Sequence, residues 1–220
     1  MKRLFFSLIL LYCMSGQNII LAGAPGYYYF DAARTAVKTI YNGKGEVTGS
    51  QEYAISRRAG GAVYGRNTVT RPGKDTEVTE CHYFIEGGTL KISMGRNAAG
   101  QEVFLDYPAV MSPGSGIVTR TGFETTARVA GKDIRVSCTI TGRKATAETE
   151  TVSSGAGTWE CIRTEYEMEL RGKVFGIGIP VNVRVVEWFA PGTGIVRTDV
   201  YRRGKLHETR LLTGFKATGK

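Results

Sequence analysis

Residues 161–170 read CIRTEYEMEL, and this stretch decides the fold class. One set of alternate positions holds Ile162, Thr164, Tyr166, Met168 and Leu170, and the other holds Arg163, Glu165, Glu167 and Glu169. Alternation with a period of two is typical of an antiparallel strand with one buried and one solvated face. Residues 134–140 and 181–185 repeat the pattern. The sequence therefore predicts a β protein rather than a helical one.

Glycine-containing pairs lie between the predicted strands, at Asn42-Gly43, Gly87-Gly88 and Arg203-Gly204. Each places glycine where a two-residue hairpin needs a positive φ. Residues 31–40 form the best helix candidate, with Asp31 as a possible N-cap, although they equally suit a first strand. We expect an all-β fold with about 10–12 antiparallel strands and at most one or two short helices. A sheet of that size must curl or close, which leaves a half-barrel, a roll or a sandwich.

The first residues have the features of a signal peptide. Lys2 and Arg3 precede a short apolar run, and small residues at 22–24 offer a cleavage site. We therefore expect residues 1–23 to be removed and residues 24–220 to form a single β domain. The predicted location is the periplasm or the outer envelope. A lipoprotein anchored at Cys13 is an alternative, which the bulky Tyr12 before it disfavours.

Three cysteines remain after residue 23: Cys81, Cys138 and Cys161. In an oxidising compartment two of them can form a disulfide. We expect Cys138 to pair with Cys161, because their strands are close in sequence. The alternative is three buried thiols that act as small apolar residues.

The net charge of +9 limits the partners of this chain. Its basic residues occur as scattered pairs without interleaved aromatic residues, so we expect no binding to nucleic acid. An anionic membrane or lipopolysaccharide surface suits the charge, as does a simple role in solubility.

No set of residues predicts catalysis. His82 directly follows Cys81 in a predicted strand, so the two side chains point to opposite faces and cannot form a nucleophile–base pair. Glu165, Glu167 and Glu169 are spaced at roughly 7 Å along one strand face, which suits acid–base chemistry or, more simply, a solvated face paired with Arg184 or Arg197. We expect no catalytic residue, no metal site and no cofactor, and hence no enzyme.

Two segments resemble a known family. Residues 157–161 (GTWEC) lead into a long strand, and residues 187–197 (EWFAPGTGIVR) lead into a hairpin. Together they resemble a group of exported bacterial β domains of unknown function that share a W-[YF]-A-P-G-x-G-[ILV]-V-[KR] segment. The resemblance implies a spiral β-roll similar in shape to the half-barrels of periplasmic lipoprotein carriers, and it implies no enzyme activity.

The leading hypothesis is a non-enzymatic envelope protein that binds an apolar ligand, a glycan or a partner protein. The candidate ligand-binding residues are Trp159, Phe175, Trp188 and Phe189, on the concave face of the sheet if it closes only partly. The alternatives are a structural or assembly module without a small-molecule site, and a glycan-active enzyme that uses carboxylates.

Overall fold

A computed structural model describes residues 34–217, apart from gaps at 60–61, 87–88, 97–99, 109–110, 115–116, 118–119, 130–131 and 175–176. Within these ranges the chain forms twelve strands and no helix, and hence no helix able to span a membrane. The strands are β1 (Arg34–Asn42), β2 (Val47–Ala59), β3 (Ala62–Thr70), β4 (Glu77–Glu86), β5 (Thr89–Arg96), β6 (Glu102–Pro108), β7 (Arg120–Val129), β8 (Lys132–Ser154), β9 (Gly157–Val174), β10 (Ile177–Ala190), β11 (Gly194–Arg202) and β12 (Lys205–Ala217).

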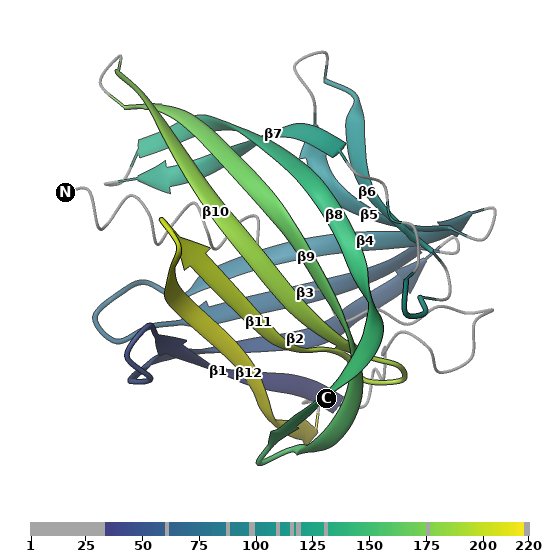
Figure 1. Ribbon diagram of the computed structural model, residues 1–220. Coiled ribbons are helices and arrows are strands. Elements are labelled where there is room, and N and C mark those ends of the chain that lie inside the picture. The colour runs from purple at the N-terminus through teal and green to yellow at the C-terminus, as the bar shows by residue number, and fades with distance from the viewer. Residues whose placement is uncertain are drawn as a thin grey trace.

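The strands form one antiparallel sheet in the order β4-β3-β2-β1-β12-β11-β10-β9-β8-β7-β5-β6. Because β4 also pairs with β5, the sheet curls back on itself into an almost closed barrel (Figure 1). The predicted curled all-β sheet is confirmed. The predicted signal peptide, residues 1–23, lies outside the described residues, as does Cys13.

The alternating pattern of residues 161–170 is confirmed in β9, and it divides the apolar residues between two clusters. The inner core lies inside the curled sheet and includes Met168 and Leu170 of β9 with Val183 and Val185 of β10. The outer cluster includes Val186, Trp188 and Ala190, which alternate with inner-core residues along β10 and so point to its opposite face; its other buried members are Ala36, Val152, Cys161, Val196 and Leu212. The sheet therefore buries side chains on both faces in this region.

The turns are confirmed in part. Arg203 and Gly204 have φ values of 51° and 73°, as a two-residue hairpin between β11 and β12 requires. Asn42 instead begins a longer turn that ends at Val47, and its Oδ1 accepts hydrogen bonds from the backbone N–H groups of Lys44 and Glu46. Residues 34–40 belong to a strand, so the helix candidate is wrong there and the first-strand alternative is right. Gly87-Gly88 lies outside the described residues.

The expected Cys138–Cys161 disulfide is wrong. All three thiols are buried, and none of them forms a disulfide in the described chain. Cys138 lies opposite Leu170 of β9, whereas Cys161 lies nine residues earlier on that strand, roughly 31 Å away. The two cysteines also face different sides of the sheet, since Cys138 belongs to the inner core and Cys161 to the outer cluster. The cysteines instead fill space as small apolar residues.

Gly65 of β3 tests how tightly the inner core is packed. A Cβ at this position would lie 2.1 Å from the hydroxyl oxygen of the buried Tyr53. We expect Gly65→Ala to lower the free energy of unfolding by about 1–3 kcal/mol, because Tyr53 must leave its position. The measurement is urea denaturation, with Gly214→Ala on β12 as the control, since a Cβ there meets no atom within 4 Å. Equal stability of the two variants would contradict this view of the core.

Candidate functional site

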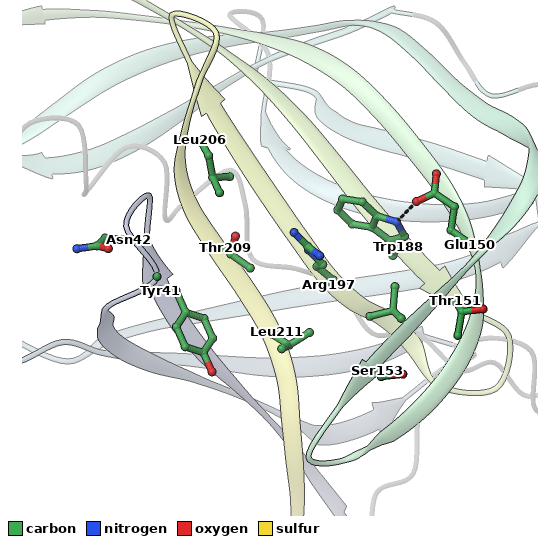
Figure 2. Close-up of a pocket in the computed structure, with 12 residues that line it drawn as sticks. Tyr41, Asn42, Glu150, Thr151, Ser153, Trp188, Arg197, Leu206, Thr209 and Leu211 are labelled. Atoms are coloured by element: carbon green, nitrogen blue, oxygen red, sulfur yellow. Dashed lines mark hydrogen bonds between the residues drawn. The ribbon is translucent and has the colours of Figure 1, made fainter.

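A cleft of about 390 Å³ lies on the outer face of the sheet (Figure 2). The residues that line it come from β1 and its turn, the far part of β8, and strands β10–β12. They are Tyr41, Asn42, Gly45, Glu150, Thr151, Val152, Ser153, Trp188, Arg197, Leu206, Thr209 and Leu211.

The cleft exists because the β8–β9 hairpin bends. Register shifts between Thr141 and Lys144 and between Ala145 and Thr149 bend the two strands, and bulges of this kind increase local twist. Figure 1 shows that the turn of this hairpin comes to lie beside the C-terminal end of β12. There Ser154 Oγ donates a hydrogen bond of 2.5 Å to the carbonyl oxygen of Leu212. The bent end of β8 thus forms one wall of the cleft, and the outer cluster lies beneath it.

Trp188 is held by a chain of polar contacts along the cleft. Its indole Nε1 donates to Glu150 Oε2 at 2.7 Å, and the Arg197 guanidinium lies 4.7 Å from the ring centroid (Figure 2). Arg197 in turn donates two hydrogen bonds, of 2.9 and 2.7 Å, to the buried carboxylate of Asp199. Thr209 Oγ1 donates to the same carboxylate at 2.9 Å.

The charges of the cleft largely cancel. Hydrogen bonds to Asp199 raise the pKa of Arg197, so this guanidinium stays protonated and the carboxylate of Asp199 balances its charge. The Glu150 carboxylate accepts from Trp188 and lies 3.8 Å from Arg163. The cleft therefore offers apolar surface and neutral hydrogen-bonding groups in fixed positions rather than a net charge.

Only some of the predicted ligand-binding residues meet here. Trp188 lines the cleft, and Trp159 packs, partly buried, against the outer cluster below it. Phe189 is 4% exposed and belongs to the inner core, because it neighbours Trp188 on β10 and points to the other face. Phe175 lies outside the described residues.

The cleft is on the outer face, whereas sequence analysis placed the site on the concave one. Apolar side chains of the inner core line the concave face around Phe189. Tyr41 and Glu150 were not among the predicted site residues, and Arg197 was noted only as the last residue of the 187–197 segment and as a possible partner of the glutamates. No local pattern marks Tyr41 or Glu150 as site residues, because they lie on different strands and only the bend of the β8–β9 hairpin brings them to one cleft.

The glutamate ladder of β9 is a charge-paired surface. Lys144, Arg163 and Arg184 all contact the Glu165 carboxylate, at 2.7, 3.2 and 3.0 Å. Hydrogen bonding to Lys144 is the largest influence on this carboxyl, and it lowers the pKa of Glu165. A general acid needs the opposite shift. The pairing with Arg184 is as predicted, whereas Arg197 pairs with Asp199.

His82 has a carboxylate partner, Glu102, whose Oε1 contacts His82 Nε2. Ser93 Oγ donates to that same Oε1 at 2.6 Å and not to the imidazole. A serine nucleophile needs direct contact with its base, so the three residues do not form a catalytic triad. The described part of the chain contains no group of three His, Cys, Asp or Glu side chains placed to hold a metal ion.

Comparison with known proteins gives one family match and two similar solved structures. Residues 33–212 match the model of a family described as DUF3108-like. A protein from Bacteroides fragilis, described as an exported protein with a YmcC-like fold, superimposes with a TM-score of 0.65 at 19% identity, covering 86% of this chain and 98% of that one. A lipoprotein from Parabacteroides distasonis gives a TM-score of 0.67 at 17% identity, covering 86% and 99%. No curated protein matches the chain.

Proposed function

The chain belongs to the DUF3108-like family, and from this starting point we propose that it is an exported, non-enzymatic binding protein of the cell envelope whose cleft holds a glycan. Export is supported by the signal-peptide features of residues 1–23. It is also supported by the descriptions of the two similar structures as an exported protein and a lipoprotein.

The observation that carries the proposal is the lining of the cleft. Tyr41, Leu206 and Leu211 supply apolar surface for the C–H faces of sugar rings, and the ring of Trp188 lies among them. The remaining neutral polar side chains of the lining are those of Asn42, Thr151, Ser153 and Thr209. Each already has a partner inside the chain, and its remaining hydrogen-bonding capacity suits sugar hydroxyls. Because Glu150 and Arg197 already have partners, a neutral polyhydroxylated ligand breaks no ion pair on binding.

The two other binding hypotheses have less support. A purely apolar ligand would remove water from the polar groups of the cleft without offering them a hydrogen bond in return. An assembly surface for a partner protein would be a sheet edge or an exposed apolar patch. Among the described residues the large apolar side chains that are exposed are those of Val47 and Val78, on β2 and β4.

Titration with defined oligosaccharides tests the proposal. The probes are peptidoglycan fragments and lipopolysaccharide core oligosaccharides, and the measurement is isothermal titration calorimetry. We expect Tyr41→Ala to weaken binding about tenfold, which equals about 1.4 kcal/mol, because a ring face for stacking is lost. Ser153→Ala should weaken it less, by the value of one neutral hydrogen bond, about 1 kcal/mol.

The control is Tyr64→Ala. Tyr64 lies on β3, outside the cleft, and its ring packs edge-on against His82 at a centroid distance of 5.6 Å. This variant should bind like the wild type. The proposal is wrong if no oligosaccharide binds, or if Tyr64→Ala weakens binding as much as Tyr41→Ala.

A further inference from the structure

A second polar region lies on the inner face of the sheet, on the side away from the cleft. Buried polar side chains follow one another across eight neighbouring strands from β8 to β3. We call them the interior polar belt: Arg143, Thr164, Tyr166, Glu187, Thr198, Glu208, Arg210, Lys38, Gln51, Asn67 and Arg71. In the centre of the belt the strand register places Thr164 opposite Glu187, Glu187 opposite Thr198, and Thr198 opposite Arg210.

Hydrogen bonds join the members of one half of the belt. Arg210 donates to Glu208 Oε1 at 2.8 Å and to Gln51 Oε1 at 3.3 Å. Gln51 donates to Asn67 Oδ1 at 2.8 Å, and Arg71 donates to Glu208 Oε2 at 2.6 Å. Burial pushes the pKa of Glu208 upward, but Arg210 and Arg71 outweigh it and hold this pKa below its usual value. Both guanidinium groups of this half therefore have a carboxylate partner.

The other half is centred on Lys38, and it is incomplete. Lys38 is 2% exposed, and its Nζ has no hydrogen-bond partner among the described residues. Glu187, which is 6% exposed, acts on Lys38 electrostatically without forming an ion pair with it. The buried hydroxyl of Thr198, opposite Glu187, likewise has no partner within the described chain. A donor such as Lys38 Nζ is costly to bury in this state.

The charges of the belt also favour an anionic ligand. Four cationic side chains (Lys38, Arg71, Arg143 and Arg210) share it with two carboxylates (Glu187 and Glu208), and the half-buried Glu77 lies near Arg71 at its edge. Lys38 is the cation of the belt that lacks a hydrogen-bonded partner within the described chain, and a buried ammonium in this state favours an anion beside it, because a low-dielectric interior strengthens the attraction between opposite charges.

We propose that the interior polar belt binds an oxyanion, a carboxylate or a phosphate, held by Lys38 and Thr198 beside Arg210 and Glu187. The ammonium of Lys38 supplies the charge, and the Thr198 hydroxyl donates to the same group. Burial raises the pKa of Glu187 above its usual value, which weakens the repulsion between this carboxyl and the anion. Val185 and Phe189, which flank Glu187 on the inner face, belong to the inner core, so the surroundings suit an apolar chain attached to the anion.

Thermal unfolding and calorimetry at pH 6 with three probes test this site. Laurate and dodecyl phosphate carry the anion on an apolar chain, and inorganic phosphate carries it alone. We expect laurate or dodecyl phosphate to raise the Tm of the wild-type protein, and Lys38→Met to bind that probe at least tenfold more weakly. The control is Lys44→Met, which removes an exposed lysine from the turn after β1 and should bind like the wild type.

Each outcome decides the matter. A response to inorganic phosphate that also depends on Lys38 would identify a free anion as the ligand, and a response to the amphiphiles alone would identify an anionic lipid. The proposal is overturned if no probe changes the Tm, or if Lys38→Met responds as the wild type does. Because the cleft lies on the other face, failure here would not affect the glycan proposal, and the reverse also holds.

Discussion

Arg210→Met should lower the free energy of unfolding by about 3–5 kcal/mol, the range measured when one partner of a buried ion pair is removed. Arg210 is 0% exposed, and it donates to Glu208 and to Gln51. Methionine fills much of the same volume but donates nothing. Glu208 would keep a single cationic partner, Arg71, and Gln51 Oε1 would lose a donor inside the sheet.

The chain contains a matched control for this variant. Arg171 and Glu169 are two residues apart on β9, as Arg210 and Glu208 are on β12, and their Nε–Oε1 distances are 2.9 and 2.8 Å. The side chain of Arg171 is 67% exposed. Arg171→Met should therefore cost less than about 1 kcal/mol, as is usual for surface ion pairs. Urea denaturation of both variants gives the comparison, and similar losses would show that burial does not determine the strength of these pairs.

The local fold could be predicted from sequence because it depends on neighbouring residues. Residues 161–170 specify a strand, because their polar and apolar side chains alternate with a period of two. Arg203 and Gly204 specify a hairpin, because their two-residue turn requires a positive φ at both positions. Residues 34–40 were ambiguous because Lys38 interrupts an apolar face. In a strand this position points inward, so the residue that obscured the pattern is part of the interior polar belt.

The sites could not be predicted, because they depend on the register of strands far apart in the sequence. Glu187 occupies an inward position among valines, and only the pairing with Thr198 and Thr164 shows that polar residues continue across the sheet. Trp188 and Phe189 form one sequence motif, yet they serve opposite faces of β10. A motif can therefore indicate a strand correctly while combining residues of two separate sites.

Lys38→Met should have the opposite effect to Arg210→Met and stabilise the ligand-free protein at neutral pH. The pKa of the Lys38 ammonium is lowered from 10.5 to about 7, and burial is the main cause. The charge of Glu187 raises this pKa in part, and the charge of Arg210 lowers it further. A shift of this size corresponds to about 5 kcal/mol of stability that the folded state loses when the buried group is charged. Methionine removes that cost, so the variant should be more stable than the wild type by an amount of this order at pH 7 or below.

The difference should disappear as the pH rises, and its sign follows from proton binding. Below pH 7 both the folded and the unfolded state hold the Lys38 proton, so the cost is at its maximum and constant. Between pH 7 and 10.5 the unfolded state binds more protons than the folded state, so the stability of the wild type rises toward that of the variant.

The Glu187 carboxyl requires its own control in this experiment. Its raised pKa has the opposite linkage, since the folded state binds the extra proton and stability falls as the pH rises above the ordinary glutamate value. Comparing the double variant Lys38→Met/Glu187→Gln with Glu187→Gln alone removes the titration of Glu187 from both proteins. Urea denaturation from pH 5 to pH 10 then gives the effect of Lys38. If the lysine-free variant is the less stable one at pH 6, Lys38 already has a partner in the ligand-free protein, and the interior polar belt needs no anion to complete it.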